Sequence, residues 1–160
     1  MPIERKHRLP PAAYRGRKSV AITGCAEDRR VCISTEETVT AFVAQLKRLA
    51  AKHACAIPIY CFMPDHFHMI VQGLFDHRRP NLLADQFKHD TGVWFSLHRP
   101  DLDWQGSYYD HIIREEDDWR RQAFYVLNNP VRKRLIEDPF EYPYSGSIGY
   151  DLRLLFDGLY

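Results

Sequence analysis

Residues 61–73, which read CFMPDHFHMIVQG, restrict the fold of this chain more than any other segment. Two apolar runs stand on either side of one short corner, Met63-Pro64-Asp65. Strands joined by so few residues must pair in opposite directions, so we expect a hairpin of strands over 56–62 and 66–72. The chain must therefore contain an antiparallel sheet, and other elements have to pack around it.

His66 and His68 stand two residues apart on the second strand of this hairpin. Because side chains alternate along a strand, both imidazoles leave the same face, whereas Phe67, Met69 and Val71 point the other way, into a core. Two imidazoles on a strand can converge on one divalent ion, but a metal site also needs a third ligand. A solvated pair of histidines on the polar face of a half-buried strand is the alternative.

The composition fits one domain over residues 1–160, because a chain that is 45% hydrophobic at this length can bury a real core. Its sequence contains no apolar run long enough to cross a membrane and no apolar segment behind the charges of the N-terminus. We therefore expect neither a membrane span nor a signal peptide, and we expect the protein to be cytoplasmic. The four cysteines form no C-x-x-C pair, which favours reduced, partly buried thiols.

The formal net charge of +1 gives no argument for a nucleic-acid partner, so such an argument has to come from local clusters. One cluster lies at the N-terminus, where basic residues far outnumber acidic ones and Pro10-Pro11 disfavours a helix. We expect residues 1–17 to form a basic extended arm, which either contacts phosphates or is simply solvated.

The remaining pattern predicts strands and helices in turn. Besides the hairpin, we expect strands over 18–25, 31–33 and 107–114 and helices from 34, over 82–97 and over 115–129. The first helix begins with a capping box of Ser34 and Glu37. The order predicts an α+β, ferredoxin-like sandwich with a mainly antiparallel sheet and helices on one face. Residues 136–160 are left as a C-terminal tail.

The last predicted helix carries a tyrosine that its packing does not need. Its apolar stripe leaves Tyr125 on another face, together with Gln122 and Asn129 at the neighbouring turns. Pro130 should end or kink the helix, so the side-chain oxygen of Asn129 can point outward, one turn beyond the phenol. An ordinary amphipathic tyrosine followed by a helix-ending Asn-Pro remains the alternative on these residues alone.

Two longer segments carry a resemblance to a known family. MPDHFHMIV resembles the His-hydrophobe-His motif of single-tyrosine (HUH-type) transposases, and DHIIREEDDWRRQAFYVLNNPVRKRLIEDPFEYPYSGS resembles the tyrosine-helix region and tail of the REP-associated tyrosine transposases. The resemblance runs in chain order over about 15–147 and includes WQGSYYDHIIR and YPYS. It implies that His66 and His68 are metal ligands, that Asn129 supplies a third, oxygen ligand, and that Tyr125 is the nucleophile. Insertion-sequence relatives often have Gln in place of Asn129, so this residue favours the REP-associated branch.

The resemblance also implies a reaction and its partners. The protein would be a metal-dependent single-strand DNA endonuclease and strand transferase that cuts beside hairpins or palindromic repeats through a covalent 5′-phosphotyrosine. A bound Mg²⁺ or Mn²⁺ would help a phenol with a pKa of about 10 to react at neutral pH. The protein would be bacterial and cytoplasmic, associated with the nucleoid when bound to DNA, and a monomer is favoured over a homodimer. The expected phosphate-binding residues are Lys88, Arg132, Lys133 and Arg134, with Arg15, Arg17 and Lys18 from the arm and its end.

Three other functions stay open at this stage. A domesticated relative could hold hairpin DNA and rarely cut it. A rolling-circle nickase would share the metal pair and the tyrosine, but should be accompanied by a helicase or origin-binding domain. A ferredoxin-like domain could also carry the two histidines without any function.

Overall fold

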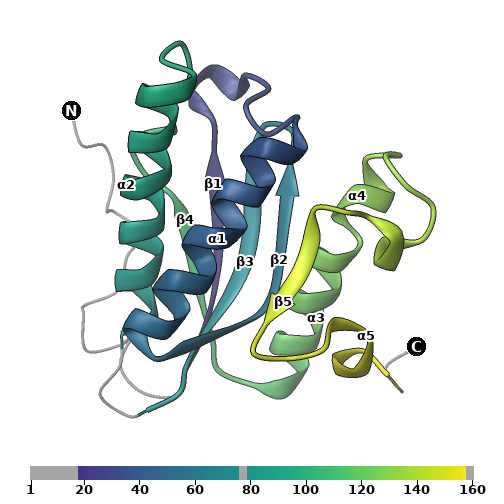
Figure 1. Cartoon of the computed structure of the whole chain (residues 1–160). Coiled ribbons are helices and arrows are strands. Elements are labelled where there is room, and N and C mark those ends of the chain that lie inside the picture. The colour runs from purple at the N-terminus through teal and green to yellow at the C-terminus, as the bar shows by residue number, and fades with distance from the viewer. Residues whose placement is uncertain (1–17, 76–78, 158–160) are drawn as a thin grey trace.

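The computed structural model describes residues 18–75 and 79–157, and five of its strands form one sheet in the order β4-β1-β3-β2-β5 (Figure 1). The strands are β1 (Ser19–Cys25), β2 (Cys55–Met63), β3 (His66–Gly73), β4 (Tyr109–Ile113) and β5 (Ser145–Ile148). Every pair of neighbours is antiparallel, and β2 and β3 form the predicted hairpin. With the helices between them, the first four strands have the ferredoxin-like order, so the predicted α+β fold is confirmed. The predicted N-terminal arm lies outside the described residues.

Two long helices, α1 (Glu36–His53) and α2 (Pro80–His98), cover one face of the sheet (Figure 1). Their core is dominated by aromatic rings, with Phe42 in edge contact with the rings of Phe62 and Phe87. The predicted capping box at Ser34 is wrong, because the helix starts one residue later. The Thr35 side chain, on an extended backbone, accepts a hydrogen bond from the Thr38 amide at 3.2 Å and caps the helix instead.

The third helix, α3 (Glu116–Leu127), packs on the opposite face, so the prediction of helices on one face is wrong for this element (Figure 1). Its buried residues Ala123 and Val126 belong to a second core with Ile59 and Ile70 of the central strands. The physical reason is that β2 and β3 carry apolar side chains on both faces. A sheet with two apolar faces needs a cover on each.

The predicted C-terminal tail contains further structure. A 3₁₀ turn, η3 (Pro139–Glu141), leads into β5, which pairs with β2, and α5 (Leu152–Leu155) follows. Tyr142 anchors this segment, because its hydroxyl donates a hydrogen bond to the Phe62 carbonyl at 2.7 Å. The YPYS segment therefore fastens an additional strand to the edge of the hairpin.

The short strand expected over 31–33 does not form. Instead, a 3₁₀ turn, η2 (Glu27–Arg29), precedes an extended stretch in which the amides of Cys32 and Ile33 both donate to the Pro64 carbonyl, at 2.8 and 3.0 Å. Because the Pro64 carbonyl accepts both hydrogen bonds, these two amides do not pair with a neighbouring strand, and the segment does not form a strand. These two hydrogen bonds hold the Met63-Pro64-Asp65 corner, which directly precedes His66 on β3.

Two expectations of composition can be compared with the structure. The four cysteines are free thiols, three of them buried and Cys25 partly exposed, as predicted. None of the helices in the described part of the chain combines the length and the apolar content needed to cross a bilayer.

Candidate active site

The candidate site lies on the sheet face that α3 covers. The register places Tyr109 of β4 beside Thr23 of β1, Thr23 beside His68 of β3, and His68 beside Cys61 of β2, in one row across the sheet. His66 follows two residues away on the same face of β3. The turn before β3 and the neighbouring strand thus hold both imidazoles on a rigid surface.

Both histidines are buried, at 6% and 8% exposure for His66 and His68. The interpretation of a solvated pair on a polar strand face is therefore wrong, because α3 and the segment after it shield this face. The two ring centroids lie 4.8 Å apart with the ring planes nearly perpendicular, at 85°. As predicted, Phe67, Met69 and Val71 point to the other core.

One nitrogen of each imidazole is already engaged. The Nδ1–H group of His66 donates to the Asp65 carboxylate, Nδ1 to Oδ1, at 2.6 Å, and Nδ1 of His68 lies 2.7 Å from the Thr23 hydroxyl. The contact with Asp65 favours the tautomer of His66 in which Nε2 keeps its lone pair, and the Thr23 hydroxyl, which can donate or accept, is compatible with the same tautomer of His68. Histidine ligands in metal sites are held in the same way, by a hydrogen bond at the nitrogen that does not face the metal.

Burial keeps both imidazoles neutral at neutral pH. It lowers the pKa of His66, although the hydrogen bond to Asp65 opposes the shift. It lowers the pKa of His68 to about 3, with smaller contributions from the neighbouring His66 and Arg132. Burial would raise the pKa of Asp65, but hydrogen bonds from His66 and Arg29 outweigh it and lower that pKa. A neutral imidazole is the form that binds a metal.

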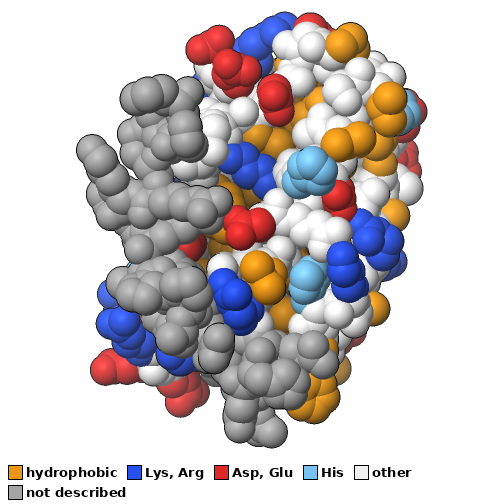
Figure 2. Space-filling view, turned by 90° about the vertical axis from the view of Figure 1, so that its left-hand side faces the viewer, with side chains coloured by type: hydrophobic (Ala, Val, Ile, Leu, Met, Phe, Trp, Pro, Cys, Tyr) orange, Lys and Arg blue, Asp and Glu red, His pale blue; other side chains and the backbone are white. Residues whose placement is uncertain are grey.

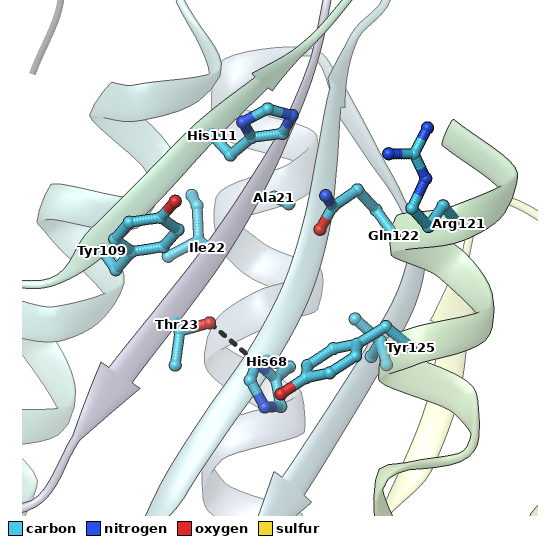
Figure 3. Close-up of a pocket in the computed structure, with 10 residues that line it drawn as sticks. Ala21, Ile22, Thr23, His68, Tyr109, His111, Arg121, Gln122 and Tyr125 are labelled. Carbon is cyan, nitrogen blue, oxygen red and sulfur yellow. Dashed lines mark hydrogen bonds between the residues drawn. The ribbon is translucent and has the colours of Figure 1, made fainter. Parts of the chain in front are cut away.

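Tyr125 projects from α3 and is 53% exposed, on the face that the helical pattern predicts. Its phenol points toward His68, and the two ring centroids lie 5.6 Å apart in an edge-on arrangement (Figure 3). The Arg132 guanidinium lies over the ring, 3.9 Å from its centroid, and donates to the Tyr125 carbonyl at 2.7 Å. The tyrosine is thus held between an imidazole and a cation.

Asn129 is the first residue of the short helix α4 (Asn129–Arg132), which directly follows the C-cap of α3. The expectation that its side chain points outward is wrong, because the residue is 3% exposed and its Nδ2 lies 3.0 Å from Nε2 of His66. The short second helix redirects the chain over the histidines. Oδ1 accepts from Arg132 at 3.3 Å, and a half-turn of the amide exchanges the oxygen and the nitrogen.

The donor set of this cluster fits a divalent cation. Over residues 18–75 and 79–157, no group of three or more His, Cys, Asp or Glu side chains converges in a way that could hold a metal. The neutral rings of His66 and His68, however, lie with their centroids 4.8 Å apart, and the Asn129 amide lies 3.0 Å from Nε2 of His66. Imidazole and carbonyl ligands in this number leave room for water or phosphate oxygens.

A cavity of about 410 Å³ opens beside the cluster, between α3 and the β1 and β4 strands (Figure 3). Tyr125 and His68 stand at one end of it. The other lining residues are Ala21, Ile22, Thr23, Tyr109, His111, Arg121, Gln122 and Val126. The sequence pattern pointed to none of the residues on β1 and β4 that line this cavity.

The predicted phosphate-binding residues lie in different places. Arg132 contacts Tyr125 and Asn129, and Lys133 and Arg134 next to it are exposed. Lys88 lies on α2, which covers the opposite face, and its ammonium is 5.8 Å from the ring of Tyr108. Exposed Lys18 precedes β1, whereas Arg15 and Arg17 lie outside the described residues. On the face that Figure 2 shows, basic side chains are mixed with acidic ones.

Sequence reasoning missed the residues that orient the imidazoles. Asp65 stands next to His66, so its proximity alone could have suggested the contact. Thr23 had a weaker signal, as a polar residue within the otherwise apolar run SVAITGC, and its position opposite His68 follows only from the register. Adjacent strands decide such partners, and one sequence does not give strand order directly.

Comparisons with known proteins identify the family and the fold. The sequence model of the family described as "Transposase IS200 like" matches residues 18–128. The fold is similar to that of a REP-associated tyrosine transposase bound to a REP hairpin, with a TM-score of 0.72 and 17% identity over 89% of this chain and 82% of that one. It is also similar to a protein from Deinococcus radiodurans assigned as a transposase, with a TM-score of 0.51 and 15% identity over 76% of this chain and 93% of that one. None of the curated proteins matches the sequence. At these identities, the two solved structures establish the fold.

Proposed function

Because this chain belongs to the IS200-like transposase family, we propose that it cleaves and rejoins single-stranded DNA with Tyr125 as its nucleophile. The substrate in this proposal is a strand beside a hairpin, by analogy with the solved relative that is bound to a REP hairpin. The observation that carries the proposal is the placement of the Tyr125 ring against His68, next to the buried pair of His66 and Asn129 on the same strand face.

The chemistry is a transesterification. The Tyr125 oxygen forms a bond to phosphorus and the bond from phosphorus to the 3′ oxygen breaks, so the strand leaves as a 3′-hydroxyl that has gained a proton. The product is a 5′-phosphotyrosine, which a new 3′-hydroxyl can attack in the reverse sense. One phosphodiester replaces another, so no external source of energy is needed.

The protein residues contribute positions and charge. His66 and His68, with the Asn129 amide turned to present its oxygen, would hold a divalent cation, Mg²⁺ or Mn²⁺, which when bound supplies positive charge to the non-bridging oxygens of the phosphate. Arg132 fixes the Tyr125 ring by lying over it and by bonding its carbonyl. Tyr125 remains partly exposed, so a DNA strand can reach it.

Removing one oxygen tests the nucleophile. Tyr125→Phe keeps the ring between His68 and Arg132, so we expect little change in stability or in hairpin binding, yet no covalent adduct on denaturing gels with single-stranded DNA and Mg²⁺ or Mn²⁺. Tyr150→Phe, at an exposed tyrosine whose hydroxyl bonds Gln72, is the matched control and should form the adduct normally. An adduct that persists in Tyr125→Phe would identify another nucleophile. DNA binding by the wild type without any cleavage would instead identify a hairpin-binding protein.

The metal ligands are tested separately from the reaction. His68→Ala and His66→Ala should each weaken Mn²⁺ binding measured by calorimetry without DNA, because each removes one of the nitrogen donors. The double variant should bind no Mn²⁺ at this site and form no adduct. Unchanged Mn²⁺ binding in the double variant would contradict the proposed ligand set.

A further inference from the structure

We propose that the cavity beside Tyr125 holds one unpaired nucleotide of the DNA strand, next to the phosphate that Tyr125 attacks. The inference rests on the proposed function, because it takes single-stranded DNA as the substrate. It adds a binding subsite that reads the base beside the cleavage point, built from residues outside the metal cluster.

Small side chains on β1 create the hollow. The register places Ala21 between His111 of β4 and Ile70 of β3, and Thr23 between Tyr109 and His68. A methyl group or a short hydroxyl side chain between larger neighbours leaves a depression in the sheet surface. The buried residues of α3 pack over the central strands, so the part of the face near β4 stays open to form the cavity (Figure 3).

An aromatic ring with an available face stands at the cavity. Tyr109 is 63% exposed and lies on β4, an edge strand of the sheet. Burial in the core does not account for such a large, exposed ring at this position. Unpaired bases stack on aromatic side chains of this kind in proteins that bind single strands, and every base offers a π-face for it.

Polar groups from β4 and α3 line the cavity in fixed orientations. Asp118 of α3 accepts from Nε2 of His111 at 2.7 Å and from Nε2 of Gln122 at 3.5 Å, and the hydrogen bond from His111 lowers the pKa of Asp118. One carboxylate thus orients an imidazole and an amide, and it leaves the amide oxygen of Gln122 facing the cavity (Figure 3). Paired donors and acceptors at fixed positions are what hydrogen bonding to a base edge requires.

The charge of the cavity suits a phosphate. Arg121 lines it and brings a positive charge, which also acts on Asp118 behind the wall. No Asp or Glu is among the described lining residues, since Asp118 stands behind His111 and Gln122. The cavity volume of about 410 Å³ lies within the usual range of small-ligand pockets, and its connection to the Tyr125 phenol favours part of the substrate strand over a separate metabolite.

Abasic substrates test the subsite. We would measure the rate of adduct formation on single strands in which each nucleotide around the cleavage point is replaced in turn by an abasic one. With the wild type, loss of the base at one position should slow the reaction about 5- to 150-fold, the range that one base–aromatic stack contributes. In Tyr109→Ala the strand with the base should react as slowly as the abasic strand does with the wild type, and abasic replacement should then have little further effect.

Filling the cavity gives a second test. Ala21→Ile adds volume where β1 is hollow, and its β-branched side chain suits a strand. We expect it to remove the base dependence while Mn²⁺ binding at the histidine cluster is retained. A 2-aminopurine base at the sensitive position should change its fluorescence on binding to the wild type, and less so with Ala21→Ile.

The outcomes separate this inference from the proposed function. Absence of any adduct in the wild type would contradict the function itself. An adduct whose rate is unaffected by abasic replacement at every position would leave the function in place and overturn the subsite. A base dependence that survives both Tyr109→Ala and Ala21→Ile would place base recognition elsewhere. Binding of a free mononucleotide that does not compete with the DNA strand would also overturn the proposed nucleotide subsite.

Discussion

At Thr23, a single hydroxyl contacts one of the two buried imidazoles of the site. It holds Nδ1 of His68 at 2.7 Å, so that Nε2 is the nitrogen left for a ligand. Asp65 likewise holds Nδ1 of His66, by a hydrogen bond to its carboxylate. The two contacts come from different neighbours, a paired strand and a hairpin corner, and together they orient the two rings that stand 4.8 Å apart.

Thr23→Val removes this hydroxyl and nearly preserves the shape of the side chain. We expect Mn²⁺ affinity, measured by calorimetry, to fall about 10- to 100-fold, because the outer contacts of metal-binding histidines contribute that much. Thr23→Ser keeps the hydroxyl and should retain most of the affinity, and Thr40→Val, on the surface of α1, should change nothing. Equal affinities for Thr23→Val and the wild type would show that the orientation of His68 does not depend on the hydroxyl.

Arg132 was expected to bind phosphate, yet its guanidinium contacts the Tyr125 ring and carbonyl and the Asn129 side chain. Arg132→Lys keeps the charge but loses the flat guanidinium and its fork of donors. We expect hairpin affinity to stay within a few-fold of the wild type, while the rate of adduct formation falls roughly 10- to 100-fold, the equivalent of one lost charge-assisted hydrogen bond.

The control for that prediction is Arg48→Lys, at an exposed residue of α1 on the opposite face of the sheet. Its adduct rate should match that of the wild type. If Arg132→Lys weakened hairpin binding and adduct formation to the same extent, Arg132 would act as the phosphate contact that the sequence suggested.

At the scale of elements, alternation along β3 was enough to place both histidines on one face and Phe67 on the other. It was not enough to say that both faces are buried. An amphipathic stripe such as that of Ala123 and Val126 predicts that a helix packs on a sheet, and it leaves open which face. Since α3 covers the histidine face, Asn129 points inward, and this direction could not be predicted from the helix alone.

The edge strand β5 was missed for a different reason. Its sequence, SGSI, lacks the run of β-branched or aromatic residues that predicts a strand, and all four residues are only half-buried. It forms because the preceding Tyr142 anchors the segment to Phe62, so tertiary contacts decide its conformation. Single-sequence patterns carry little information about such strands.

Gly24 supports the site from the other face of the sheet. It pairs with Phe67, and a Cβ at Gly24 would clash with the ring atoms Cε1 and Cζ of that residue. The ring cannot withdraw easily, because Phe87 and Trp104 pack against it with centroids at 5.2 Å. Phe67 stands between the two histidines on β3, so a displaced ring would also displace them.

We therefore expect Gly24→Ala to lower the free energy of unfolding by about 1–3 kcal/mol, the usual cost of overpacking a core, and to weaken Mn²⁺ binding as well. Urea denaturation measures the first effect and calorimetry the second. Gly106→Ala is the matched control, since a Cβ there meets nothing within 4 Å. A stability loss of the same size in Gly106→Ala would show that backbone freedom, and not the contact with Phe67, is responsible.

At the scale of the whole molecule, the candidate site is assembled within one chain. His66 and His68 come from the central strand, and Tyr125 and Asn129 come from the helices that the same chain lays over that strand. The short connection between β4 and α3 brings the tyrosine back to its own sheet. We therefore propose that each site is self-contained, since the tyrosine and the histidines of one chain already lie together.

Mixing two inactive variants tests this self-contained assembly. Tyr125→Phe lacks the nucleophile and the double variant His66→Ala/His68→Ala lacks both proposed nitrogen ligands, so neither should form an adduct alone. If each site uses its own tyrosine, co-expression of the two variants should restore nothing, since every chain still lacks one component. If the tyrosine came from a partner, half of the dimers would combine the two variants and each would have one intact site, so about a quarter of the wild-type adduct would return. Co-purification through two different tags and thermal melts of each variant would establish that both chains are folded and were able to meet, and a restored adduct would then contradict the monomeric site.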